Sequence, residues 1–133
     1  MSWLYNGEPF LDCGEYYGFV YLITNKIDGR KYIGKKFFWS SKRKQVNKVR
    51  KRYKVESDWK DYWSSSDELK ADVAKLGEQN FTRTILHLCK NKGSCNYLEA
   101  KEQFLNGVLE YPELWYNAWI QVKVMRSHVK LLK

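Results

Sequence analysis

Cysteine and histidine are scarce in this sequence of 133 residues, and their scarcity excludes several kinds of protein. The three cysteines are too few for a disulfide framework, and no CxxC or Cys/His grouping has the spacing of a zinc site. The two histidines are too few for a histidine-built metal site. We therefore expect reduced thiols and a cytoplasmic protein. The residues concerned are Cys13, Cys89, Cys95, His87 and His128.

Long apolar runs are also missing. No stretch of 18 apolar residues occurs, so no transmembrane helix is expected. Residues 1–10 lack a charged start followed by an apolar stretch, so they do not read as a signal peptide. We expect neither a membrane partner nor a small-molecule cofactor. The length and the 44% of apolar residues instead suit one domain with one hydrophobic core.

Positive charge is abundant and concentrated. The net charge is +9, and eight of the thirteen residues from Lys42 to Lys54 are Lys or Arg. Such a cluster attracts a polyanion, which favours contact with nucleic acid over a solvated basic loop. Attachment to a membrane surface is disfavoured because the run lacks an apolar face. The candidate DNA contacts are Lys36, Lys42, Arg43, Lys44, Lys48, Arg50, Lys51 and Arg52.

The patterning predicts an α+β fold, a small sheet flanked by helices. Residues 1–17 are expected to form an irregular arm, residues 18–117 the domain, and residues 118–133 a basic extension. Within the domain, the basic stretch 37–57 has no clean period, so we expect a loop or a marginal helix there, disordered without a partner. Strands are expected at 18–25, 31–36 and 81–89, helices at 67–76 and 97–108, and extended chain at 114–125.

Two short motifs flank the expected Asp28-Gly29 turn. The first is G-F-V-Y from Gly18 to Tyr21, and the second is Y-I-G, which begins at Tyr32. The pair resembles the signature of the GIY-YIG nucleases, including the eleven-residue separation of the two tyrosines. The first half departs from the family by one additional residue between glycine and tyrosine.

The resemblance continues in order along roughly 100 residues, to Asn117. Ser64–Cys89 looks like the family's middle helix and third strand, Glu102–Phe104 like the helix with the metal-binding glutamate, and Tyr116-Asn117 like the pair near the module's end. More loosely, the chain resembles free-standing nucleases of tailed phages, which would act in the host cytoplasm. The resemblance implies an antiparallel three-stranded sheet and a DNA endonuclease that uses one Mg²⁺ or Mn²⁺ ion.

The two tyrosines can be tested by strand parity. If Asp28-Gly29 is a two-residue turn, Asn25 lies opposite Tyr32, and Tyr21 shares that face. The resemblance then implies that one of these tyrosines helps to activate the attacking water. Packing of both phenols remains the alternative.

The lysine that follows Y-I-G is a candidate for lowering a tyrosine pKa or for contacting phosphate. The resemblance favours Lys35, whereas strict alternation places Lys36 on the tyrosine face.

Glu102 is the expected metal ligand, because Mg²⁺ takes few carboxylates and keeps several waters. An apolar stripe on the second helix would place Glu102 at its edge and Glu99 opposite it, towards water. The members of that stripe are Tyr97, Leu98, Lys101, Phe104, Leu105 and Val108.

Other site assignments stay open. Asn117 could hold phosphate, orient Glu102 or form a turn. The family's arginine falls by count near Arg43, with Arg50 or Arg52 as alternatives. Three aromatic residues beside the basic run could stack on bases but more often cap a core; these are Trp59, Tyr62 and Trp63.

Three questions about function remain open. The competing function is a nuclease-like fold that binds DNA or RNA without cutting, and RNA is an alternative substrate. A double-strand break would require a homodimer or two successive nicks.

Overall fold

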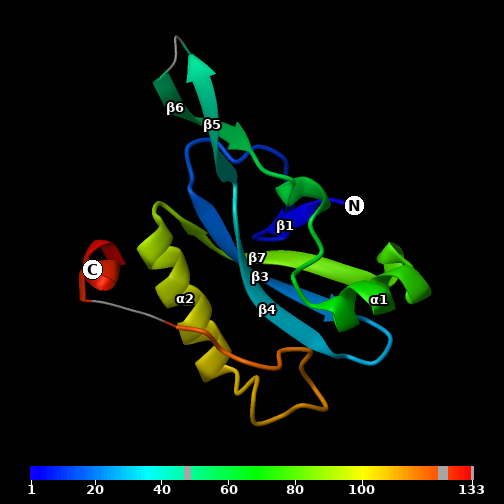
Figure 1. The fold of residues 1–133 in the computed structure, drawn as a ribbon. Coiled ribbons are helices and arrows are strands. Elements are labelled where there is room, and N and C mark those ends of the chain that lie inside the picture. Colours follow the sequence, from blue (N-terminus) through cyan, green and yellow to red (C-terminus); the bar gives the residue numbers. More distant parts are fainter. Residues whose placement is uncertain (47–48, 123–125, 133) are drawn as a thin grey trace.

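The fold is a five-stranded mixed sheet with a helix on each face (Figure 1). The structure, a computed structural model, describes residues 1–46, 49–122 and 126–132, and the side chains of residues 42–52 and 130–132 lie outside that description. The strand order is β2-β1-β7-β3-β4. These strands are β1 (Trp3–Tyr5), β2 (Glu8–Phe10), β3 (Gly18–Asn25), β4 (Lys31–Phe37) and β7 (Phe81–Cys89).

The three expected strands are present, but the sheet is larger than expected. β3 pairs antiparallel with both β4 and β7, and β1 adds a parallel neighbour to β7 through Leu4 and Tyr5. The expectation of an irregular N-terminal arm is therefore wrong, because this segment contributes two strands. Aromatic side chains supply the reason: Trp3 is fully buried against Phe19 and Tyr21, so β1 completes the core.

The β3–β4 hairpin keeps the expected parity with a different register. Ile23, rather than Asn25, lies opposite Tyr32, and the connection is longer than two residues. Asn25 closes it by accepting hydrogen bonds from the amides of Ile27 and Gly29. Gly29 has a φ of +80°, a conformation that glycine adopts without strain. The shift is an even number of residues, so each side chain keeps its predicted face.

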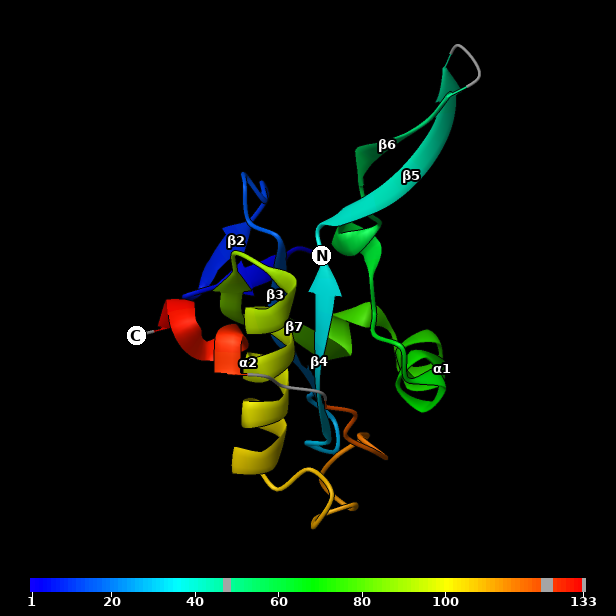
Figure 2. The same cartoon turned by 60° about the vertical axis from the view of Figure 1, so that its left-hand side comes forward.

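Each face of the sheet buries its own cluster. Phe19, Tyr21 and Ile23 alternate onto the face covered by α1 (Asp67–Leu76), where Leu69 and Val73 are buried. The opposite face is covered by α2 (Lys92–Leu105); its cluster is Val20, Ile33, Cys89, Cys95, Val108 and Trp115. Figure 2 shows the two helices on opposite sides of β4.

α1 has the predicted bounds. The side chain of its N-cap, Ser66, accepts a hydrogen bond from Leu69 N, and Gly77 ends the helix with a φ of +93°. The described residues also form 3-10 helices at Trp59–Asp61, Glu78–Asn80 and Arg126–Leu132. No helix among the described residues is long and apolar enough to cross a membrane.

α2 differs from the prediction in both its start and its buried face. It begins at Lys92 with Asn91 as N-cap, five residues earlier than expected. The predicted apolar stripe is wrong in part: Leu98 and Val108 pack in the cluster on this face, whereas Phe104 and Leu105 are 60% and 71% exposed. Small and polar side chains also pack inward, namely Ser94, Cys95, Ala100 and Gln103.

The basic stretch is a β-hairpin rather than a loop or helix. β5 (Trp39–Val46) pairs with β6 (Val49–Glu56) throughout, as a separate two-stranded sheet. In both views it extends away from the five-stranded sheet (Figures 1 and 2). The expected extended segment near the C-terminus makes only one bridge, between Lys31 and Trp115, and residues 123–125 lie outside the described residues.

Candidate active site

An open cavity of about 700 Å³ lies along the edge of the sheet at β4. Because β4 is an edge strand, side chains from both faces of the sheet can reach around it into one space. Tyr32 comes from the α1 face, whereas Lys35 and the α2 residue Glu99 come from the other face. Further lining residues include Ser65, Ser66, Asp67, Glu68, Lys92, Asn96, Gln103, Tyr116, Asn117, Trp119 and Gln121.

The two motif tyrosines share a face, as parity predicts. Their rings stack with centroids 6.1 Å apart, and Tyr62 packs edge-on against Tyr21 at 6.1 Å. The register places Tyr21 opposite Gly34, where an added Cβ would lie 2.5 Å from the Tyr21 hydroxyl. The glycine of Y-I-G is therefore needed to admit this phenol.

Only one tyrosine of the pair reaches the cavity. Tyr21 is 1% exposed, and burial, with Tyr62 and Tyr32 nearby, raises its pKa well above the usual range. Tyr32 lines the cavity and its hydroxyl lies 3.1 Å from Ser65 Oγ. Burial also raises the Tyr32 pKa, and the Ser65 hydrogen bond acts in the opposite direction. Tyr32 is thus the phenol placed to meet a substrate.

The lysines of β4 obey strict alternation. Lys36 lies on the tyrosine face, where its Nζ is 4.2 Å from the centre of the Tyr62 ring and 2.7 Å from Asp58 Oδ1. Lys35 lies across the strand and pairs with Glu99, with Nζ 3.1 Å from Oε1. Lys35 lines the cavity nonetheless, because the edge position opens both faces to it.

The expected contrast between the two glutamates is reversed. Glu99, predicted to face water, has a side chain 14% exposed and lines the cavity. Burial raises its pKa, and Lys35 opposes the shift. Glu102 is not among the lining residues; its Oε1 lies 3.0 Å from His87 Nε2. The error follows from the predicted stripe, which counted the exposed Phe104 and Leu105 as buried.

Asn117 joins the C-terminal segment to the edge strand. Its Oδ1 accepts from Ile33 N at 3.1 Å, and its Nδ2 donates to Ile33 O at 2.8 Å. Gln103 Nε2 donates to the same carbonyl at 2.9 Å. These side chains satisfy backbone groups that an edge strand would leave unpaired. Asn117 therefore shapes the wall of the cavity and makes no hydrogen bond to Glu102 among those observed.

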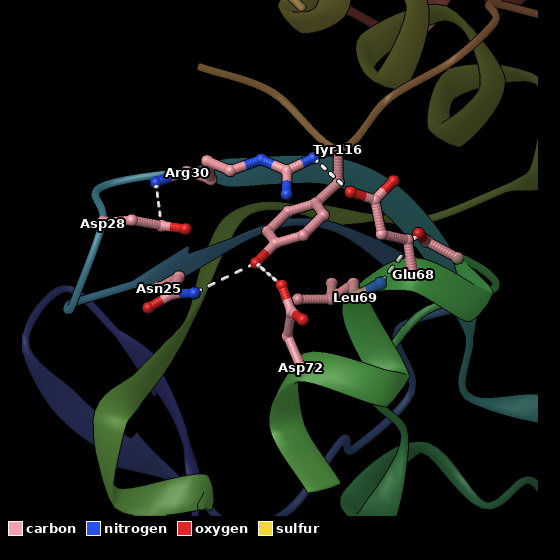
Figure 3. A network of polar contacts seen from close by, with 8 residues as sticks. Asn25, Asp28, Arg30, Glu68, Leu69, Asp72 and Tyr116 are labelled. Atoms are coloured by element: carbon pink, nitrogen blue, oxygen red, sulfur yellow. Dashed lines mark hydrogen bonds and ion pairs between the residues drawn. The ribbon is translucent and has the colours of Figure 1, made fainter. Parts of the chain in front are cut away.

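Tyr116 fixes the other side of the same segment (Figure 3). Its hydroxyl accepts from Asn25 Nδ2 at 3.0 Å and donates to Asp72 Oδ2 at 2.7 Å. Burial is the main cause that raises the Tyr116 pKa to about 12; the Asn25 hydrogen bond lowers it and Asp72 adds to the rise. The guanidinium of Arg30 lies 3.9 Å from the ring centre and pairs with Glu68 at 2.6 Å.

Side-chain oxygen donors of α2 line the cavity. Among the described residues no three of His, Cys, Asp and Glu come together, so neither a histidine- or cysteine-rich site nor a cluster of three carboxylates is present there. Glu99 supplies a carboxylate, and Asn96, one turn earlier on α2, has a buried Oδ1 with no hydrogen-bond partner. One carboxylate, an amide oxygen and water ligands suit Mg²⁺.

The position of the predicted arginine side chain relative to the cavity lies outside the description. The backbone of Arg43 lies on β5, in the hairpin that leaves the sheet, and its side chain lies outside the described residues, as do those of Lys42, Lys44, Arg50, Lys51 and Arg52, and the whole of Lys48. Within the description, the cations beside the cavity are Lys35, Lys92 and Arg30.

The aromatic residues beside the basic run belong to the core, as favoured. Trp59 is fully buried and donates from Nε1 to Glu56 Oε1 at 2.8 Å, and Tyr62 and Trp63 pack against the same cluster. An aromatic residue that the sequence did not single out, Trp119, lines the cavity and is 66% exposed.

Comparison with known proteins identifies a family for this chain. Residues 3–120 match the family model described as "Putative endonuclease segE, GIY-YIG domain". Neither a curated protein nor a solved structure matches the chain. The match begins at Trp3 and thus includes the strands that precede the first motif.

Proposed function

The chain belongs to the SegE GIY-YIG endonuclease domain family, and from this premise we propose that it hydrolyses phosphodiester bonds of DNA with one divalent cation at the β4 edge. The observation that carries the proposal is the convergence of three different chemical groups on one open cavity. These are the phenol of Tyr32, the ammonium of Lys35 and the carboxylate of Glu99.

We assign to Tyr32 the removal of a proton from the attacking water. Hydrolysis requires that the water lose a proton as its oxygen bonds to phosphorus. A phenol is protonated near neutrality, and burial raises the Tyr32 pKa further, so Tyr32 accepts a proton only if it passes its own onward. Ser65 Oγ, 3.1 Å away and exposed, offers that path to solvent. Tyr21 is too deeply buried to meet substrate and acts by holding Tyr32 in its stack.

Lys35 and Lys92 are proposed to bind the phosphate. Both line the cavity, and an ammonium group is a point charge suited to phosphate oxygens. Arg30 stands beside them in a pair with Glu68, whose side chain is 60% exposed. Such an exposed ion pair contributes little stability, so a phosphate can replace the carboxylate at low cost. Arg43 remains a second candidate for this role.

Glu99, with Asn96, is proposed to hold the cation, and Glu102 is the alternative ligand from α2. A bound Mg²⁺ or Mn²⁺ would stabilise charge on the phosphate and on the leaving oxygen. The pair that Glu99 forms with Lys35 opposes the rise that burial causes in the Glu99 pKa and so favours the anionic form that a cation binds.

Plasmid nicking tests the proposal and separates the two glutamates. Wild-type protein should convert supercoiled DNA to the nicked form with Mg²⁺ or Mn²⁺ and not with EDTA. Glu99→Gln should lose at least 100-fold in rate, whereas Glu102→Gln should retain most of it. If Glu102→Gln loses more activity than Glu99→Gln, Glu102 is the metal ligand. Wild-type activity in both variants would refute an α2 carboxylate ligand.

A binding protein without nuclease activity is the second candidate function. Two observations favour it: Glu99 is already paired with Lys35, and both motif tyrosines have raised pKa values. In that case wild-type protein shifts DNA on a gel and never nicks it with either cation. Parallel digestion of RNA shows whether RNA is the preferred substrate.

A further inference from the structure

The β5–β6 hairpin has the form of an anchored, projecting arm. Its base is tied to the body by Trp39 Nε1 donating to Tyr16 O at 3.1 Å and by Phe38 N donating to Tyr17 O at 2.9 Å. Glu56 Oε1, at the end of β6, accepts from Trp59 Nε1 within the buried cluster. Beyond this base the two strands pair only with each other (Figures 1 and 2).

The arm is electrostatically unfavourable on its own. The register places Arg43 opposite Arg52 and Lys44 opposite Lys51. Like charges in directly opposed positions destabilise a strand pair, and a two-stranded ribbon without an apolar face is marginal in water. A bound polyanion would remove both problems. The composition of the arm is therefore explained by a partner that supplies closely spaced negative charge.

In the outer part of the arm, the arginine positions and the lysine positions fall on different faces of the ribbon. Opposed positions share a face, as do positions two apart in a strand. The register and this alternation therefore assign Arg43, Arg50 and Arg52 to one face, and Lys42, Lys44 and Lys51 to the other. Lys54 shares the arginine face but lies at the base of the arm, with its Nζ 5.5 Å from the centre of the Trp39 ring. The planar guanidinium group matches guanine O6 and N7 with two hydrogen bonds in a fixed geometry, whereas the ammonium group is a point charge on a flexible stem that suits phosphates better.

The dimensions select one kind of nucleic acid. The major groove of B-form DNA, about 12 Å wide, admits a two-stranded ribbon. The major groove of an A-form RNA duplex is too deep and narrow to be read by side chains. Strands of eight residues span about 26 Å at about 3.3 Å per residue, or roughly eight base pairs.

We propose that the β5–β6 hairpin is a sequence-reading arm that lies in the DNA major groove, with its arginine face towards the bases and its lysine face towards phosphates. β5 follows β4 after a single residue, Phe38, so the arm begins beside the cavity. The bases that it reads lie on one side of the cut, within about one helical turn. The substrate class rests on the proposed function, but the reading role does not depend on cleavage.

Binding selections from a randomised duplex library in EDTA test this role without catalysis. The full chain is compared with two triple variants. R43K/R50K/R52K conserves the net charge and should keep the salt dependence of binding but lose most of the selected guanine preference. K42Q/K44Q/K51Q should keep the preference and reduce the slope of log K against log salt by about 2.7, which is about 0.9 for each phosphate that a lysine no longer neutralises.

Two measurements on wild-type protein keep the test independent of the variants' folding. Methylation of guanine N7 in the selected site should weaken binding, and an RNA duplex of the same sequence should compete poorly. The proposal is overturned if no sequence is enriched, if R43K/R50K/R52K selects the same site, if N7 methylation has no effect, or if the RNA duplex binds equally well. A protein that selects a site but never nicks DNA refutes the proposed enzyme and leaves the arm intact.

Discussion

At the scale of single residues, Gly34 shows how tightly the tyrosine pair is built. A Cβ there would lie 2.5 Å from Tyr21 Oη and 2.8 Å from Tyr32 Cε1, well inside normal contact. We expect Gly34→Ala to cost about 1–3 kcal/mol of unfolding free energy through overpacking. Tyr21→Phe removes the nearest atom and should restore part of that loss in the double variant. A urea-unfolding double-mutant cycle with no coupling would show that the hydroxyl does not occupy this space.

Lys35 should tune the acid limit of the reaction through Glu99. The lysine opposes the rise that burial causes in the Glu99 pKa. In Lys35→Met the burial remains and the opposing charge is lost, so the pKa rises further. The carboxylate must be ionised to bind a cation, and the acidic limb of the kcat/KM profile should therefore move to higher pH.

Lys36→Met is the matched control for this effect, because Lys36 pairs with Asp58 on the other face. It should leave the position of the acidic limb unchanged. If Lys35→Met lowers the rate equally at every pH, the lysine contacts phosphate without influencing Glu99.

At the scale of elements, the edge of β4 depends on side chains in place of a neighbouring strand. Asn117→Ala removes both hydrogen bonds to Ile33 and leaves the buried backbone amide of Ile33 without an acceptor. An unsatisfied buried group costs about 1–3 kcal/mol. Gln103→Ala removes one donor to the carbonyl, which Asn117 still serves. The Ile33 amide should lose protection from hydrogen exchange in Asn117→Ala and keep it in Gln103→Ala. Equal protection in both variants would show that Asn117 does not hold this amide.

The elements that the sequence predicted well have strong local patterns. α1 and β7 were found with the observed bounds, because a helix cap, a terminating glycine and β-branched residues mark them. The β5–β6 hairpin was missed because its strands lack the alternation of apolar and polar residues that identifies a half-buried strand. The start of α2 was missed because Gly93 and Ser94 are weak helix formers, which the Asn91 cap and burial of Cys95 offset.

At the scale of the whole molecule, the site was predicted in part. Parity placed Tyr21 and Tyr32 on one face, because that inference needs only one hairpin. The cavity could not be inferred, since it forms where both faces of β4 become accessible at the sheet edge. The order of the strands depends on the complete fold, and so does the packing of polar α2 side chains against β4. Glu99 was accordingly missed, although its spacing from Asn96 and Gln103 traces the inward face.

Tyr116 joins the sheet, α1 and the C-terminal segment, so its ionisation should change the free energy of unfolding of the whole domain. Folding raises its pKa from 10 to about 12, so the folded state holds the phenol proton more tightly. The resulting stabilisation is complete below about pH 10 and is lost as the pH rises towards 12. In urea unfolding from pH 8 to 11, the stability difference between wild type and Tyr116→Phe should stay constant at first and shrink above pH 10. Tyr111→Phe, at a position 52% exposed, is the control that should show no such change. A difference between wild type and Tyr116→Phe that is constant to pH 11 would mean that the phenol titrates alike in the folded and unfolded chains.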